Sequence, residues 1–192
     1  MRSLLISAVT VIALSGTVWV SHAEAVNAEG YAVYSALLSE MHADPDKSVR
    51  VISDKTAADF SPGKENKQFD FIRENLSPIS QATIDDFKVQ NVTSTQLENK
   101  LNLKFKVVLV TKEEIDKFVG QGGSWWKGFY QQYPNSNGLI TLSNVGFNPT
   151  MTEALVYVAH TCDGLCGTGH YVLLLKVEGK WKVERKVMAW IS

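Results

Sequence analysis

The clearest pattern in the chain is the alternation of apolar and polar residues along its last third. It predicts four strands, over residues 138–147, 151–162, 170–179 and 180–190. Turn-forming residues separate them, with Asn148-Pro149-Thr150 before the second strand and Glu178-Gly179 before the fourth. Consecutive strands joined by short turns pair antiparallel, so we expect an antiparallel meander with one buried face.

The last of these strands should show its two faces directly. Trp181, Val183 and Val187 fall on one side if the alternation is regular. The other side then carries Lys182, Glu184 and Lys186, which we expect in solvent. Arg185 interrupts the apolar side.

The N-terminal part has the periodicity of helices. Apolar residues recur every three or four positions within residues 26–43, and a weaker pattern spans residues 80–89. Thr111 and Glu114 have the spacing of a capping box, and a short helix is expected over residues 124–133. Short strands are expected over residues 48–53 and 103–110. The prediction is an α+β fold, with N-terminal helices packed on a C-terminal antiparallel β-meander of about four strands.

The first residues have the pattern of a secretory signal peptide. Arg2 is the only charged residue before Glu24, and an apolar run leads to Ser21-His22-Ala23, a small-x-small cleavage pattern. We expect residues 1–23 to be removed and residues 24–192 to form a single α+β domain of the periplasm or extracellular space. The alternative is an uncleaved membrane anchor, because the run borders on spanning length. No later segment predicts a stable membrane span.

Charge adds little to this picture. The formal net charge is −1, so no basic excess points to nucleic acid. The sequence contains no phosphate-binding loop, no nucleophile elbow and no metalloprotease motif, and it predicts no cofactor.

The stretch HTCDGLCGTGH is the densest candidate for chemistry. An oxidising compartment favours a disulfide between Cys162 and Cys166, closing a hairpin in which Gly164, Gly167 and Gly169 take positive φ. The alternative is a metal site, since two thiolates and two imidazoles suit zinc or copper(I). Its ligands would be His160, Cys162, Cys166 and His170. A redox role is disfavoured, because nothing basic nearby would lower a thiol pKa.

A second candidate is the aromatic segment before Pro134. Trp125 with Phe129 makes one stripe at helical spacing, and Trp126 with Tyr130 and Tyr133 makes another. Such a helix is buried on most sides, or it offers one stripe as a groove for a ligand, a glycan or a partner protein.

Three C-terminal stretches resemble a group of small exported bacterial proteins of unassigned function. They are YPNSNGLITLSNVGFN, ALVYVAHTCDGLCGTGHYVLL and WKVERKVMAWIS. The resemblance implies export from a bacterium and no particular activity.

Three functions follow as hypotheses. The first is an exported, non-catalytic binding or accessory protein of the cell envelope, whose partner is an unknown ligand or envelope protein. The second is a metal-binding protein that uses the His/Cys hairpin. The third is an enzyme with a cleft between helices and sheet, for which no catalytic residue is identified.

Overall fold

The computed structural model describes four stretches of the chain, residues 26–41, 48–58, 65–118 and 125–192. The expected signal peptide, residues 1–23, lies outside them. No helix in the described stretches is long and apolar enough to cross a bilayer.

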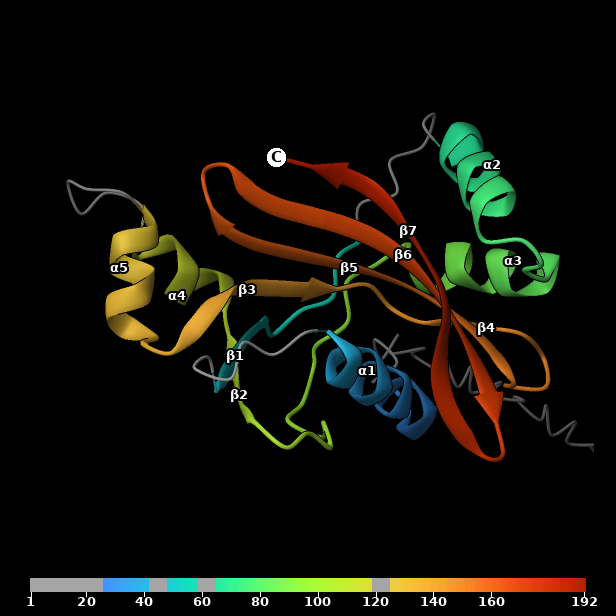
Figure 1. Ribbon diagram of the computed structural model, residues 1–192, viewed down its shortest axis with the longest axis horizontal. Helices are drawn as coiled ribbons and strands as arrows, with labels where there is room; N and C mark the ends of the chain where they lie inside the picture. The colour runs from blue at the N-terminus through green and yellow to red at the C-terminus, as the bar shows by residue number, and fades with distance from the viewer. Residues whose placement is uncertain (1–25, 42–47, 59–64, 119–124) are drawn as a thin grey trace, which may run out of the picture.

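A seven-stranded sheet is the centre of the fold (Figure 1). Its order is β2-β1-β3-β5-β6-β7, and the short β4 pairs with β5. The strands are β1 (Val49–Ser53), β2 (Lys106–Val110), β3 (Ser136–Leu142), β4 (Gly146–Phe147), β5 (Glu153–Asp163), β6 (Cys166–Val177) and β7 (Lys180–Ile191).

The expected meander is present but is only part of this sheet. β3, β5, β6 and β7 pair antiparallel in sequence order. β1 pairs in parallel with both β2 and β3, so the sheet is mixed. The α+β class is therefore confirmed, whereas a purely antiparallel sheet of about four strands is wrong. The parallel part was missed because its strands are far apart in sequence and leave no turn signal.

Helices cover both faces of the sheet (Figure 1). They are α1 (Ala28–Glu40), α2 (Glu65–Asn75), α3 (Gln81–Gln90), α4 (Lys112–Asp116) and α5 (Trp125–Gln132). α1 packs with Ile52, Ile140 and Val156 on one face. On the other face, α2 and α3 cover Leu155 and Leu173, and α5 covers Val51. Neighbouring residues of one strand thus enter different layers, as the period of two requires.

Local signals fix several helix starts. The Thr111 hydroxyl accepts a hydrogen bond from the Glu114 amide at 3.1 Å, and the Glu114 carboxylate accepts one from the Thr111 amide at 2.8 Å. This confirms the predicted capping box. Asn27 caps α1 in the same manner by accepting from the Gly30 amide at 2.8 Å.

β7 does not have the single apolar side that its alternation predicts. Its pairing with β6 shifts register at two places, one of them between Leu173 and Leu174. An extra residue in a strand reverses the direction of the side chains that follow it. Trp181 and Val183 therefore pack with α1, whereas Val187 packs on the opposite face. Lys186, expected in solvent with Lys182, is brought to the α1 face.

The glycines of the β5–β6 hairpin serve a purpose other than the one predicted. Gly164, Gly167 and Gly169 do not adopt positive φ. A Cβ on Gly169 would instead overlap the indole of Trp190, and one on Gly167 would lie 2.9 Å from the same ring. Two of these glycines therefore leave space for a side chain from β7.

Candidate functional site

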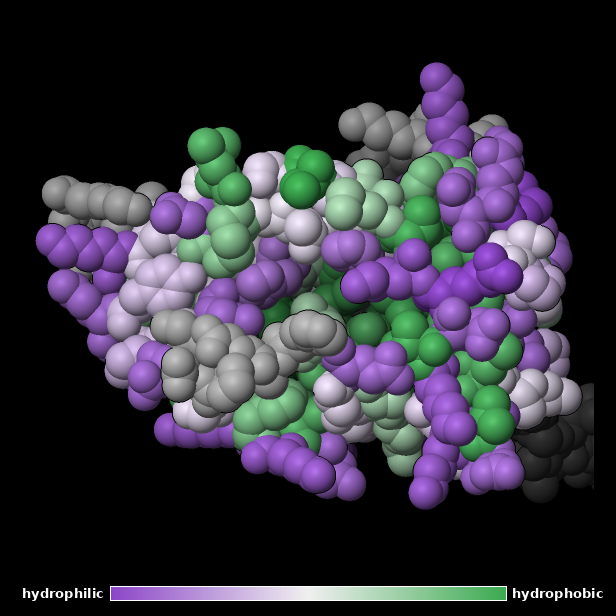
Figure 2. All heavy atoms as spheres, in the orientation of Figure 1, coloured by the Kyte–Doolittle hydropathy of each residue, from purple (hydrophilic) through white to green (hydrophobic). Residues whose placement is uncertain are grey.

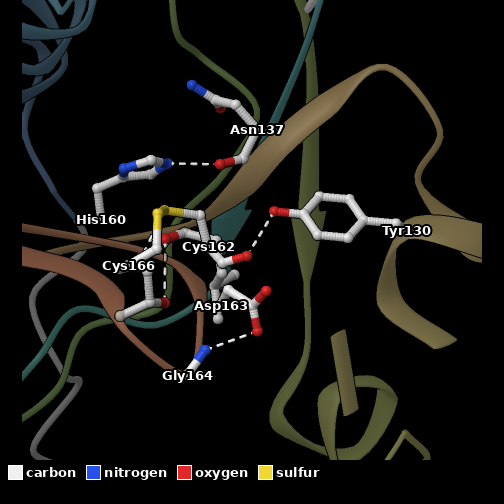
Figure 3. Close-up of a disulfide and its surroundings, with 9 residues drawn as sticks. Tyr130, Asn137, His160, Cys162, Asp163, Gly164 and Cys166 are labelled. Carbon is white, nitrogen blue, oxygen red and sulfur yellow. Dashed lines mark hydrogen bonds between the residues drawn. A yellow bond between two sulfur atoms is a disulfide. The ribbon is translucent and has the colours of Figure 1, made fainter. Parts of the chain in front are cut away.

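The two cysteines form a disulfide at the end of the β5–β6 hairpin (Figure 3). Their Cα atoms are 5.2 Å apart, and the turn between the strands is stabilised by a 2.7 Å hydrogen bond from the Gly164 amide to the Asp163 carboxylate. An oxidised pair is compatible with an exported location.

The predicted metal ligands are not gathered into one cluster. The sulfurs of Cys162 and Cys166 are bonded to each other and so are not thiolates. Across the described part of the chain, no three His, Cys, Asp or Glu residues are grouped so that they could hold a metal ion. Metal binding by this hairpin thus stays a hypothesis for a reduced form.

The aromatic residues of α5 pack against the sheet and one another. Phe129 is fully buried, while Trp125, Trp126, Tyr130 and Tyr133 are half-buried in the same cluster. Trp125 stacks on Phe129 with ring centroids 5.3 Å apart, and Trp126 stacks on Tyr130 at 5.8 Å. The Tyr130 hydroxyl donates to the Cys162 carbonyl at 2.7 Å (Figure 3). Both stripes thus contribute mainly to packing, and a ligand groove along α5 stays a prediction.

A concave site lined by four basic side chains lies elsewhere, on the α1 face of the sheet. We call it the α1 cleft; its volume is about 240 Å³. Its basic residues are Arg50, His160, His170 and Lys186, its neutral polar residues are Asn137 and Thr168, and its apolar residues are Leu37, Met41, Ile140 and Val158. Figure 2 shows hydrophobic residues in a hollow near the middle of the molecule, beside α1, with hydrophilic residues around it.

Five strands contribute to this cleft. Arg50 comes from β1, Asn137 from β3, His160 from β5, His170 from β6 and Lys186 from β7. The pairing explains the convergence, because His160 lies opposite Thr168 while Val158 lies opposite His170. The two histidines are diagonal neighbours on one face of a regular ladder.

Arg50 is the most deeply buried of the charged groups, with 2% of its surface exposed. Its guanidinium carbon lies 4.5 Å from the centroid of the Phe105 ring, a cation–π arrangement. Its Nη1 donates to the Val49 carbonyl at 3.4 Å. A buried guanidinium keeps its charge, so Arg50 contributes positive charge to the α1 cleft.

His160 has a defined tautomer. Its Nε2 lies 2.8 Å from the Asn137 carbonyl oxygen (Figure 3). A carbonyl only accepts, so Nε2 carries the hydrogen and the neutral ring has its lone pair on Nδ1. Burial lowers the pKa of His160, and the charge of Arg50 lowers it further, against the opposing effect of that hydrogen bond.

His170 also has a lowered pKa. Its pKa is lowered by burial first and by the Lys186 ammonium second. Lys186 itself is exposed, so it places a mobile cation at the rim. The register shift in β7 is what aims Lys186 here.

Sequence reasoning found only two of these residues, His160 and His170, and assigned them to a metal site with the cysteines. Arg50, Asn137 and Lys186 were missed. The arginine did leave a signal, since it is a charged residue in the middle of the apolar strand VRVIS. Nothing in the sequence marks Asn137. Lys186 could be placed in the cleft only once the register of β7 against β6 was known.

Comparison with models of protein families, with curated proteins and with solved structures finds no match for this chain. The function is therefore argued from the geometry of the α1 cleft.

Proposed function

We propose that this protein is an exported, non-catalytic binding protein of the cell envelope, and that it binds a small organic anion in the α1 cleft. One observation carries the proposal: four basic side chains from four strands line one cleft, and no described lining residue is acidic. The disulfide supports the exported location because such a bond persists in an oxidising compartment.

The composition of the cleft indicates the kind of anion. Arg50 and Lys186 provide fixed positive charge, and electrostatic attraction is strong where water is partly excluded. Leu37, Ile140 and Val158 form apolar wall that an inorganic ion would not use. A short aliphatic chain with an anionic head matches both parts.

An enzyme remains the second candidate because of His160. A half-buried imidazole with a lowered pKa is neutral near pH 7, and a neutral imidazole can act as a general base. Among the described residues lining the cleft, however, no carboxylate orients this ring and only Thr168 carries a hydroxyl. Binding is therefore the simpler use of these groups.

The test is a titration of the oxidised protein with hexanoate at pH 7, followed by calorimetry and by amide shifts. We expect saturable binding with a Kd of about 1 mM or lower, and no binding of 1-hexanol or hexylamine. Shifts should centre on β5, β6 and β1. A matched pair of exposed lysines on β7 supplies the control: Lys186→Gln should weaken hexanoate about 3-fold, whereas Lys182→Gln should not.

Equal binding of hexanoate and 1-hexanol would contradict the proposal, because the cleft would then select only for apolar surface. Shifts centred on α5 would move the site to the aromatic helix.

A further inference from the structure

Three side chains of the α1 cleft have polar atoms that are open to solvent. These atoms are the Thr168 hydroxyl, the ring nitrogens of His170 and Nδ1 of His160, and none has a hydrogen-bond partner among the described residues. None of them is closed off from solvent, in contrast to the side-chain oxygen of Asn137. A ligand in the cleft can therefore contact all three side chains directly.

The strand pairing places these side chains next to one another on one face of the sheet. His160 lies opposite Thr168, and His170 follows Thr168 by two residues and so points to the same face. Neighbours of this kind have Cβ atoms about 5 to 8 Å apart, so one head group can contact all three. Lys186 lies opposite Val172, further along the same face, and its charge acts on His170 from the rim.

The three side chains differ in what they offer a ligand. Thr168 can donate its hydroxyl hydrogen, and the ring of His170 can donate an N–H. His160 cannot donate to the cleft, since its Nε2 hydrogen is bonded to the Asn137 carbonyl and its Nδ1, on the other side of the ring, has a lone pair (Figure 3). The head group must therefore accept hydrogen bonds and also share a proton with His160.

A phosphate monoester meets both requirements. It has three terminal oxygens that accept hydrogen bonds strongly, and its second pKa of about 6 lets it carry or release one proton near neutral pH. That proton can lie between a phosphate oxygen and Nδ1 of His160. A carboxylate, with an ordinary pKa of about 4.3, is fully ionised at pH 7 and brings no hydrogen to this nitrogen.

We infer that the anion bound in the α1 cleft is a short alkyl phosphate monoester, whose phosphate accepts from Thr168 and His170 and shares one proton with His160. This inference rests on the proposed function and names its ligand class. Val158, opposite His170, begins the apolar wall for the alkyl chain. A cleft of about 240 Å³ is smaller than most ligand pockets, which favours a short soluble ester over a lipid with the same head group.

The experiment compares hexyl phosphate, hexyl methyl phosphate and hexanoate by calorimetry at pH 7, in two buffers of different ionisation enthalpy. We expect hexyl phosphate to bind about 10-fold more tightly than either of the others, with an uptake of about one proton. The diester is the closest comparison, because it keeps the tetrahedral head group but has no proton to share.

Two variants test the contacts. Thr168→Val removes the hydroxyl with little change of shape and should weaken hexyl phosphate about 10-fold. Thr141→Val is the matched control, since Thr141 is half-buried on the opposite face of the sheet and its loss should leave the affinity unchanged. His160→Gln should remove most of the proton uptake, because glutamine does not titrate near pH 7.

The outcomes separate the two proposals. If hexanoate binds but hexyl phosphate binds no more tightly or takes up no proton, the phosphate monoester is wrong and the anion site survives. Equal binding of the diester would also overturn it, since the shared proton would then contribute nothing. If no anion binds, both proposals fall. The ligand comparison in the unmodified protein decides these cases even if a variant does not fold.

The source of the phosphate is tested by sedimentation with phosphatidylcholine vesicles that contain phosphatidic acid. We expect the protein to stay in the supernatant. Protein in the pellet, released by hexyl phosphate, would overturn the short ester in favour of a lipid phosphate.

Discussion

The α1 cleft contains two histidines whose pKa values are lowered by burial and by the cations beside them. Burial is the main cause that disfavours the protonated form of both rings, and the charge of Arg50 adds to it at His160 as that of Lys186 does at His170. Each ring is therefore a weaker base than free histidine, and each is neutral at pH 7. A bound anion reverses the balance, because it stabilises the protonated ring.

We therefore predict that anion affinity increases as the pH falls below 6.5, the ordinary pKa of these side chains, and through their lowered pKa values. Hexanesulfonate is the suitable probe since it stays charged. Its affinity should rise about 10-fold from neutral to acidic pH, measured by calorimetry, and the rise should shrink in His160→Gln and His170→Gln. An affinity that is flat with pH in the unmodified protein would show that neither ring meets the anion.

The free protein should show the opposite trend in stability. Folding lowers the pKa of both rings, so the unfolded chain binds more protons than the native state below pH 6.5. Their contribution to the free energy of unfolding is fully present above that pH and decreases as the pH falls. Acid should thus weaken the free protein while strengthening its complex.

Single residues were predictable where the signal is local. The Thr111 capping box and the Cys162–Cys166 pair each depend on residues only a few positions apart, and both are found. The cleft depends on Arg50, Asn137 and Lys186, which are distant in sequence and meet only through strand pairing. The pattern of residues along the chain does not show which residues of β1 and β3 pair. The convergence of these three side chains therefore could not be predicted.

At the scale of elements, Trp190 near the end of β7 packs on the β5–β6 hairpin close to its turn. Its indole lies over Gly167 and Gly169 and donates to the Tyr157 hydroxyl at 2.7 Å. Besides the β6–β7 pairing, one side chain of β7 thus reaches across β6 to β5, the strand that contributes His160.

Gly169→Ala should therefore destabilise the protein by about 1 kcal/mol in urea unfolding, because the new Cβ displaces the indole from its hydrogen bond. Gly164→Ala is the matched control in the same hairpin. A Cβ there meets no atom within 4 Å, so its effect should stay within about 0.5 kcal/mol. The cost of Gly169→Ala should also vanish in a Trp190→Leu background, and an unchanged cost there would assign it to the strand itself.

The elements illustrate which features a period can predict. Strands are present at all six expected places and the α1 helix is present too, because each element repeats with its own period. The faces of β7 were assigned wrongly because a register shift within the strand reverses which residues point to each face. The parallel pairing of β1 with β2 and β3 depends on contacts between distant segments, which no local pattern encodes.

At the scale of the whole molecule, two parts of the β5–β6 hairpin contribute differently: one lines the α1 cleft, and the other contains the disulfide. Near the middle of the sheet, Val158 and His170 line the α1 cleft. At the tip, Cys162 and Cys166 join the strands outside the core. The disulfide closes a small loop, for which chain entropy gives about 2 kcal/mol of stabilisation. It supports the hairpin and is not part of the cleft.

The disulfide and the expected signal peptide both indicate export, and the mass of the exported protein tests both. Protein purified from the exported fraction should begin at Glu24, and its denatured mass should be lower by two hydrogens than that of the reduced chain. Neither cysteine should be alkylated before reduction.

Replacing both cysteines by serine should lower the free energy of unfolding by about 2 kcal/mol and leave hexanoate affinity unchanged. A native mass that includes a metal ion, with both thiols alkylated once it is stripped, would instead restore the His160, Cys162, Cys166 and His170 site. Because that site needs reduced sulfurs and the α1 cleft does not, hexanoate binding by the oxidised protein would then separate the two.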